Sequence, residues 1–330
     1  MIEVLNAFCK FGKRPPPTHS FQPLPNSAIR LLHGRGKEFP GFEHVTIEWL
    51  PPYLLIVFHP SWHRPCHHPR DLEIQTAIKE FFTHLVCPQI LGIFIQIRDN
   101  EGRIVWEVLK GTIPETPVVV PEGDRQFLIN FGADQNIGLF LDMHPLRVWL
   151  SKNASSKKIL NLFSYTCSLS VAAKLGMASE VHNVDMRKNF LTWGRQNHQL
   201  NQCENKIFYH HLDILKSFSR LKRLGPFDLV IIDPPSHQKS FSIGHDYPRL
   251  LKRVSEWLNS SGRLVLVAND PGLAREDFRN MAEQALGPSF QFICWGESPT
   301  ILLGNDANFP VKVAFYTKLM EKVEELCTRK

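Results

Sequence analysis

The chain lacks a cysteine framework and a membrane-length apolar run, and these absences limit what it can be. Its seven cysteines are an odd number at irregular spacings, which argues against the disulfide scaffold of a small secreted protein. Residues 1–10 have no basic start followed by a long apolar run, so a signal peptide is not expected. The apolar stretches are all shorter than a membrane span. We therefore expect a cytoplasmic protein.

A further absence concerns dinucleotide cofactors. The glycine fingerprint G-x-G-x-x-G lets a backbone turn approach a pyrophosphate closely. It does not follow the first strand expected in the α/β part of this chain. A nicotinamide oxidoreductase is therefore disfavoured.

What is present is the composition of an ordinary globular protein with a mild positive charge. The 330 residues are 43% hydrophobic, which is enough for a full core without disulfide staples. Lysine and arginine number 38 against 32 acidic residues, giving a net charge of +6. This balance suits a nucleic-acid partner, although many enzymes share it. The cations Lys216, Arg220, Lys222 and Arg223 fit such a partner or a solvated helix face.

Changes in pattern along the chain predict three parts. Residues 1–27, with five prolines between positions 11 and 26, form an arm. Residues 28–120 form a small α+β domain, with β-rich runs, one helical run and a hairpin turn. Residues 121–330 form an α/β domain, which opens with a strand pair expected at 127–131 and 138–141.

The α/β domain is expected to hold a doubly wound sheet. Seven strands are predicted, at 158–163, 181–185, 207–210, 227–233, 263–268, 290–295 and 311–317. Helical patterns separate the first six, which is typical of parallel βαβ units with helices on both faces. No helix separates the last two, so they should pair antiparallel. A dinucleotide-binding sheet would instead close with another crossover, so this hairpin is a first indication of a methyltransferase.

In an open α/β sheet, ligands bind at the carboxyl ends of the strands. The first strand is followed by residues 161–168, a turn that leads into a helix N-terminus and can present backbone N–H groups to a ligand. The second strand ends at Asp185, whose carboxylate can accept hydrogen bonds from ribose hydroxyls; the alternative role is a helix N-cap.

The next two strand ends also carry acids. Asp213 could accept from the amine of an adenine or, equally, serve as an N-cap. The fourth strand is followed by Asp233, Pro234 and Pro235, a rigid loop whose carbonyl groups can point at a base or at a reacting methyl group. A purely structural Asp-Pro-Pro turn is the alternative.

Three stretches carry a likeness to a known family. Residues 138–147 read GLFLDMHPLR, residues 160–173 read LNLFSYTCSLSVAA, and residues 233–236 read DPPS. They resemble the G-x-F-L-D-x-R-x-x-R, L-N-L-F-x-Y-T-G-x-F-S-V-A-A and D-P-P-[SK]-F segments of class I methyltransferases of large-subunit (23S) ribosomal RNA. That family modifies cytosine carbon five or guanine ring nitrogen seven. A weaker likeness begins near residue 29.

The resemblance implies a Rossmann-like class I methyltransferase domain, the cofactor S-adenosylmethionine (product S-adenosylhomocysteine), and ribosomal RNA as the partner. Carried over by position, the family's cofactor residues and their neighbours fall on Asn161, Phe163, Ser164, Tyr165, Thr166, Cys167, Ser168, Asp185, Met186, Asp213, Ile214 and Asp233. The expected transfer site is Asp233, Pro234, Pro235 and Asn269. Substrate or lid candidates are Asp142, Arg147, Ser236 and His237.

The chain departs from the family pattern at three positions. Cys167 stands where the family has a glycine, and a side chain there is costly if the backbone has a positive φ or approaches the cofactor. His144 replaces an arginine, and His237 replaces an aromatic residue. These departures motivate one alternative, a non-catalytic descendant that binds RNA or protein. A methyltransferase of a protein or small molecule is the other.

The stretch after the fifth strand predicts the acceptor atom. Cytosine carbon five is a poor nucleophile, and enzymes that methylate it first add a cysteine thiolate to the ring. In the family that cysteine follows the fifth strand, where this chain reads Val267-Ala268-Asn269-Asp270. A guanine ring nitrogen already carries a lone pair and needs only alignment. We therefore expect a base nitrogen.

A group of histidines and Cys66 between residues 59 and 68 could bind a metal ion. Its spacing is too tight for a standard zinc module, so no metal site is expected.

Overall fold

The computed structural model describes residues 24–34, 38–60, 69–85, 87–99, 101–132, 135–235, 241–270, 272–298, 301–303 and 311–320. The chain forms two compact units. The first unit is Met1–Asp142 with Ser298–Pro310, and the second is Met143–Glu297 with Val311–Lys330. The proline-rich arm lies almost wholly outside the described residues, as do residues 61–68 of the histidine group.

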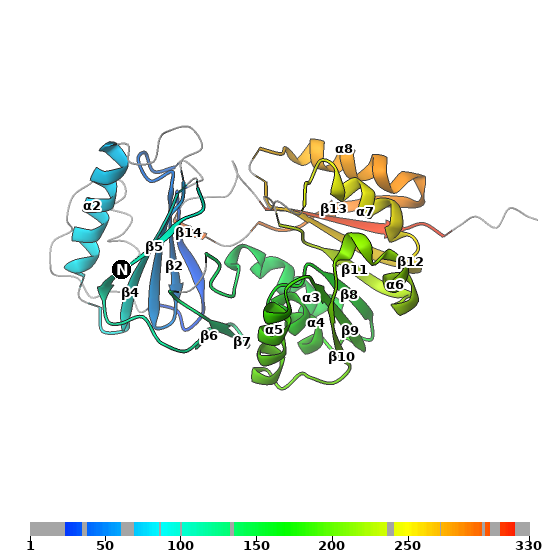
Figure 1. The fold of residues 1–330 in the computed structure, drawn as a ribbon, viewed down its shortest axis with the longest axis horizontal. Coiled ribbons are helices and arrows are strands. Elements are labelled where there is room, and N and C mark those ends of the chain that lie inside the picture. Colours follow the sequence, from blue (N-terminus) through cyan, green and yellow to red (C-terminus); the bar gives the residue numbers. More distant parts are fainter. Residues whose placement is uncertain are drawn as a thin grey trace, which may run out of the picture. The chain divides into compact units, whose positions relative to one another are not determined.

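The first unit is built on a six-stranded sheet in the order β14-β1-β2-β3-β4-β5. Its strands are β1 (Ile29–His33), β2 (Val45–Leu50), β3 (Tyr53–Phe58), β4 (Gly92–Arg98), β5 (Ile104–Lys110) and β14 (Ile301–Leu303). One helix, α2 (Pro69–Thr83), packs on it through Ile78, which is fully buried with Ile47 and Ile56 of the sheet (Figure 1). The α+β character expected from the sequence follows from this mixture.

A hairpin of β6 (Val118–Glu122) and β7 (Arg125–Ile129) ends the first unit's N-terminal segment, and it corrects the expected strand pair. The partner of residues 127–131 was predicted to be 138–141, but β7 pairs with β6. The short turn at Gly123 brings β6 and β7 together locally. Residues 138–140 form no strand, and Gly138 has a φ of 115° that a strand cannot accept.

The hairpin also explains where the first unit stops. The N–H of Ala28 donates to the carbonyl of Pro121 at 2.7 Å, and the N–H of Gly123 donates to Ser27 Oγ at 3.0 Å. These bonds attach the hairpin to the start of the domain. The hairpin therefore belongs to the first unit, whose N-terminal segment runs to Asp142.

The second unit confirms the predicted seven-stranded, mostly parallel sheet with a terminal antiparallel pair. Its order is β10-β9-β8-β11-β12-β15-β13. The strands are β8 (Lys158–Leu162), β9 (Glu180–Asp185), β10 (Ile207–His211), β11 (Phe227–Ile232), β12 (Leu258–Ala268), β13 (Phe290–Trp295) and β15 (Lys312–Lys318). The first five of these run parallel, and β15 lies antiparallel between β12 and β13.

Helices cover both faces of this sheet because its strands are apolar on both sides. They are α3 (His144–Asn153), α4 (Ser168–Leu175), α5 (Lys188–Leu200), α6 (Phe218–Leu224), α7 (Asp246–Val254) and α8 (Arg275–Leu286). Ile159 and Ile231 face a core shared with α3 and α4, whereas Leu160 and Val230 face one shared with α6, α7 and α8. Alternating strand residues fill opposite faces, as the pleat requires.

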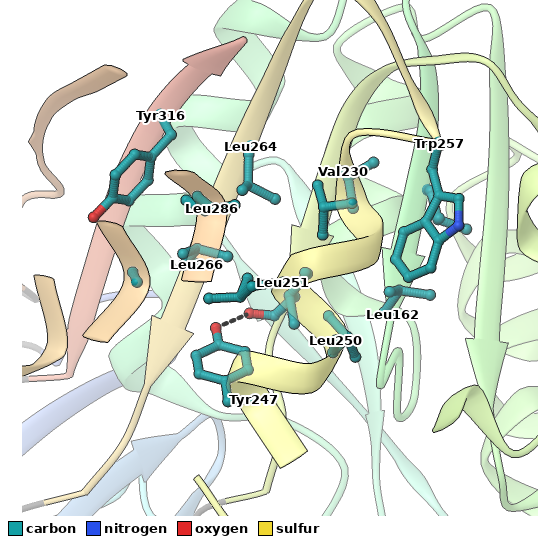
Figure 2. Packing of buried hydrophobic residues seen from close by; sticks show 14 of the residues in the cluster. Leu162, Val230, Tyr247, Leu250, Leu251, Trp257, Leu264, Leu266, Leu286 and Tyr316 are labelled. Carbon is teal, nitrogen blue, oxygen red and sulfur yellow. Dashed lines mark hydrogen bonds between the residues drawn. The ribbon is translucent and has the colours of Figure 1, made fainter. Parts of the chain in front are cut away.

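Figure 2 shows part of the second core, in which Tyr247 and Leu250 of α7 pack among strand residues such as Val230. Across the described part of the whole chain, no helix combines the length and the apolar character needed to cross a membrane.

Candidate functional site

The site is set by the point where strand order reverses. The chain runs outward from β8 through β9 to β10, then returns to β11 on the other side of β8. Helices leaving β8 and β11 therefore diverge at the carboxyl edge, which is where ligands bind in open α/β sheets. The segments after β8, β9, β10, β11 and β12 all lie along this edge, so the sequence candidates on these segments share one side of the sheet.

In the turn after β8, every second residue from Phe163 to Cys167 has a positive φ. Phe163, Tyr165 and Cys167 have φ values of 57°, 48° and 63°, which side chains rarely adopt. Such conformations cost about 1 kcal/mol or more each and need outside support. Here, the N–H of Ser164 donates to the carbonyl of Val184 at 3.1 Å, so the turn is tied to the end of β9.

Asp185 joins the turn after β8 to the turn after β9. Its Oδ2 accepts from the N–H of Tyr165 at 2.9 Å, and its Oδ1 accepts from the N–H of Arg187 at 2.8 Å. The N-cap residue of α5 is Arg187, so Asp185 is not the helix cap considered as its alternative role. Burial raises the pKa of the Asp185 carboxyl. Each oxygen still has a lone pair to offer a hydroxyl donor.

A buried polar network supports the same turn from α5, and sequence reasoning missed it. Asn197 Nδ2 donates to the carbonyl of Thr166 at 2.9 Å. Ser170 Oγ donates to the carbonyl of Cys167 at 3.3 Å and lies 2.7 Å from His198 Nε2. The available signal was the polar pair Asn197-His198 in an otherwise amphipathic helix, where both side chains are fully buried.

The Cys167 side chain is accommodated by a glycine on α5. The thiol is fully buried, and a Cβ placed on Gly194 would lie 2.3 Å from its sulfur. The missing side chain at Gly194 therefore makes the space that Cys167 fills. Cys167 has the positive φ that the resemblance made costly for a side chain. Its side chain is buried inside the protein and is not exposed at the carboxyl edge.

The start of α4 offers unused hydrogen-bonding groups to a ligand. Its N-cap residue, Cys167, makes no side-chain cap, so the first N–H groups of the helix depend on other partners. Among the described residues, Asn161 Oδ1 and Ser164 Oγ are buried polar atoms without a hydrogen-bond partner. Asn161 does bond Asn183 Oδ1 through its Nδ2, at 3.1 Å. Donors at a helix N-terminus and buried acceptors fit a zwitterionic amino-acid group.

Asp213 performs the capping role that the sequence left open. Its Oδ1 accepts from the N–H of Leu215 at 3.1 Å, which caps the 3-10 turn η3 (Ile214–Lys216). Its Oδ2 lies 3.2 Å from Lys216 Nζ, an exposed cation. Ile214 is buried, whereas Met186 is exposed. Contact of Asp213 with a base remains a prediction.

The ends of β11 and β12 are held together by Tyr247 of α7. Its hydroxyl lies 3.2 Å from the carbonyl oxygen of Ile232 and 3.0 Å from that of Val267. Figure 2 shows Tyr247 with a dashed hydrogen bond at its hydroxyl. These carbonyls directly precede Asp233 and Ala268, so the hydroxyl fixes the spacing of the two loops. Sequence reasoning did not find Tyr247, because a buried helix position gives no chemical signal.

The loop after β12 is supported by a buried cation. Lys312 Nζ donates to the carbonyl of Asp270 at 2.8 Å, and the lysine is almost fully buried. Asn269 is exposed, Pro234 is buried, and Asp233 and Pro235 are half-buried. Because β11 and β12 are neighbouring parallel strands, Asp233 and Asn269, which follow them, lie at the same edge of the sheet.

Of the remaining candidates, Arg147 lies beside the turn after β8: it is fully buried in α3, and its Nη1 donates to Ser168 Oγ at 3.4 Å. Asp142 belongs to the first unit. Ser236 and His237 lie outside the described residues. Among the residues the structure describes, no group of three or more potential ligands could hold a metal ion.

Sequence comparisons relate the chain to methyltransferases. A family model described as S-adenosylmethionine-dependent methyltransferase matches residues 29–316. Ribosomal RNA large subunit methyltransferase K/L of Psychromonas ingrahamii is 33% identical over 217 residues, covering 62% of this chain and 28% of that relative. The protein of that name from Acinetobacter baumannii is 30% identical over 245 residues, covering 68% of this chain and 33% of the relative. This chain thus spans about a third or less of these curated relatives.

Solved structures share the architecture. A SAM-dependent methyltransferase structure from Streptococcus mutans has a TM-score of 0.75 and 26% identity, covering 88% of this chain and 75% of that one. A methyltransferase complexed with SAH has the same TM-score and coverage at 24% identity, so its likeness shows the fold.

Proposed function

Because residues 29–316 match its family model, the chain belongs to the S-adenosylmethionine-dependent methyltransferases, and we propose that it methylates ribosomal RNA at a base nitrogen. The observation that carries this proposal is the carboxyl edge, where Asp185, Asp213 and Asp233 follow three strands around the reversal point. The ribosomal RNA methyltransferases among the relatives support the substrate class.

The donors and acceptors of the edge fit the cofactor. Asp185, already fixed by two backbone N–H groups, would accept from the ribose hydroxyls. The open N–H groups at the start of α4 would receive the carboxylate of the methionine end. Asp213 would face the adenine. When bound, the cofactor supplies an electrophilic methyl group on a sulfonium.

The chain's own contribution is alignment of the acceptor base. Asp233 and the carbonyl groups of Pro234 and Pro235 would accept from the exocyclic amine of a guanine-type base and so orient its ring lone pair. Asn269, from the neighbouring loop, would make a second contact. Because that lone pair needs no base to remove a proton, orientation and exclusion of water supply the catalysis.

The cysteines support a nitrogen acceptor rather than cytosine carbon five. Carbon-five chemistry needs a reactive thiolate. In the described part of the second unit, Cys167 and Cys203 are buried, and burial raises the pKa of the Cys203 thiol to about 11 and that of Cys167 further. Cys294 is exposed on β13, which lies beyond β15 at the far side of the sheet from β8.

Calorimetric titration with S-adenosylmethionine tests the cofactor site. We expect Asp185→Ala to weaken binding roughly 10- to 100-fold, because charge-assisted hydrogen bonds to the ribose are lost. Asp277→Asn, at an exposed acid in the first turn of α8, is the matched control and should bind like the wild type. A folded wild type that binds no cofactor would contradict the proposal and favour a non-catalytic role.

A further inference from the structure

The structure enlarges a basic cluster that the sequence showed only in part. Three of its cations lie on α6 and are exposed. The neighbouring helix α7 adds three more, separated from the first group by more than twenty residues of sequence. We call the six together the α6–α7 basic face: Arg220, Lys222, Arg223, Arg249, Lys252 and Arg253.

An aromatic side chain joins the two helices. The guanidinium carbons of Arg249 and Arg253 lie 5.8 and 5.9 Å from the ring centroid of Phe218, the first residue of α6. The Phe218 ring also packs 5.8 Å from Trp257. Figure 1 shows α6 and α7 on the same side of the sheet. Cation–π contacts of this kind hold guanidinium groups in place without using their N–H donors, although Arg253 also donates to Glu256 through Nε and Nη2.

The positive charge of this face is only partly compensated. Glu256 lies 3.3 Å from Lys222 and 2.9 Å from Arg253. Among the residues that the structure describes, no ion pair engages Arg220, Arg223 or Lys252. Helix α6 has no acidic residue, and α7 has only Asp246 at its start. The next helix, α8, carries Glu276, Asp277 and Glu283, so the positive excess of α6 and α7 does not extend onto it.

The two helices that carry the face begin at the edge of the proposed transfer site, and four of the six cations, Lys222, Arg223, Lys252 and Arg253, lie in their last turns, away from that edge. Helix α6 follows the turn capped by Asp213, and α7 follows the Asp233 segment. With seven and nine residues, the helices extend about 10 and 14 Å from that edge at 1.5 Å per residue. Since one nucleic-acid strand carries a phosphate about every 3.4 Å, the longer helix spans roughly four phosphates.

We propose that the α6–α7 basic face binds the sugar–phosphate backbone of the RNA substrate and guides the strand toward the carboxyl edge, an inference that rests on the proposed function. A row of exposed cations fits a polyanion of regular spacing. The apolar residues of α7, among them Leu250 and Leu251, are buried in the core. The helix therefore has no exposed apolar face for a lipid surface, which membrane-binding helices require.

A charge-matched pair of variants tests the proposal. In the test variant, Arg220, Arg223 and Lys252 are each changed to Gln. In the control, Lys152, Lys157 and Lys206, which lie outside α6 and α7, are each changed to Gln. The probe is a fluorescein-labelled single-stranded RNA of mixed sequence, and its Kd is measured by anisotropy over a series of salt concentrations. Titration with S-adenosylmethionine checks that both variants are folded.

We expect the test variant to bind RNA about 10- to 100-fold more weakly at 0.1 M salt, with a slope of log K against log salt lower by about 2, since each phosphate contact contributes about 0.7. The control should change the Kd less than threefold. Equal losses in the two variants, an unchanged slope, or binding of the wild type to phosphatidylserine vesicles but not to RNA would overturn the proposal. Cofactor binding without methyl transfer would instead contradict the proposed function. The Kd for RNA would still test the basic face, because it does not depend on methyl transfer.

Discussion

At the scale of single residues, Gly194 explains how this chain can have Cys167 where the family has a glycine, because the absent side chain at Gly194 leaves room for the thiol. A Cβ on Gly194 would lie 2.3 Å from the Cys167 sulfur. Gly194→Ala should therefore destabilise the protein by about 1–3 kcal/mol through overpacking. Urea unfolding would measure this loss.

The matched control is the double variant Cys167→Gly with Gly194→Ala. It removes the sulfur that the new methyl group would strike and relieves the left-handed backbone at position 167. We expect it to recover most of the lost stability, a coupling that a double-mutant cycle detects. Additive losses in the double variant would show that the two side chains do not share one space.

Tyr247 gives a second prediction at this scale. Tyr247→Phe removes the hydroxyl that lies between the carbonyls of Ile232 and Val267, while keeping the buried ring. We expect a loss of about 1–3 kcal/mol in unfolding free energy and a lower kcat. Phe290→Leu, in the same core but on β13, is the comparison: it should lower stability but leave the kcat of the folded enzyme unchanged. An unchanged kcat in Tyr247→Phe would show that the hydroxyl does not position the loops.

The pKa of Asp185 leads to a pH prediction. Its carboxylate must be ionised to accept both the backbone and ribose donors, and burial raises its pKa. Protonation on acidification should therefore weaken S-adenosylmethionine binding, starting at a higher pH than for an exposed aspartate, whose pKa is about 3.9. Calorimetry between pH 4 and 7 measures this. Affinity that is constant over the whole range would contradict the assignment.

Sequence alone could place acids at strand ends but could not assign their partners. Asp185 and Asp213 were both predicted at the edge, yet only coordinates show that Asp185 links two turns while Asp213 caps η3. Asn197, Tyr247 and Lys312 were missed because each acts on a backbone carbonyl distant in sequence. Such contacts produce no local pattern of residue spacing from which sequence analysis could predict them.

At the scale of elements, α5 supports the turn after β8 through a neutral histidine. Burial lowers the pKa of His198 to about 4, below its usual value near 6.5, because the charged ring would be desolvated. The unfolded state therefore takes up this proton first. Its contribution to stability is present above pH 6.5 and is lost as the pH falls toward 4, by up to about 1.4 kcal/mol per pH unit.

His198→Gln tests that contribution. Urea unfolding at several pH values should show a shallower loss of stability between pH 6.5 and 4 in the variant than in the wild type. His182 and His210, whose pKa values are also lowered by burial, remain in both proteins and so cancel in the comparison. Parallel curves for the two proteins would show that His198 does not titrate as proposed.

The regular elements of the second unit followed from sequence because each strand and helix carries its own periodicity. Helix α4 spans the predicted residues 168–175. The failures concern pairing. Residues 138–141 were predicted to be a strand, but the β6–β7 hairpin closes locally. Strand β14 lies between the last two predicted strands, where none was predicted, and it pairs with β1 far earlier in the chain. Short strands of this kind are fixed by their partners rather than by their own residues.

At the scale of the whole molecule, the chain combines two compact units with one carboxyl edge rich in acids. The family and the fold could be inferred from sequence because the motif segments coincide with the strand ends of a doubly wound sheet. The division into units could not be, since β14 pairs with β1 of the first unit across a large sequence separation.

Methyl transfer itself tests the central claim most directly. The full chain would be incubated with labelled S-adenosylmethionine and 23S ribosomal RNA transcribed in vitro, and the RNA digested to nucleosides for mass spectrometry. The account predicts label in a methylated guanine nucleoside with the wild type, and at least tenfold less with Asp233→Ala that still binds the cofactor. A wild type that binds both cofactor and RNA but labels no nucleoside, or that labels cytosine carbon five, would contradict it.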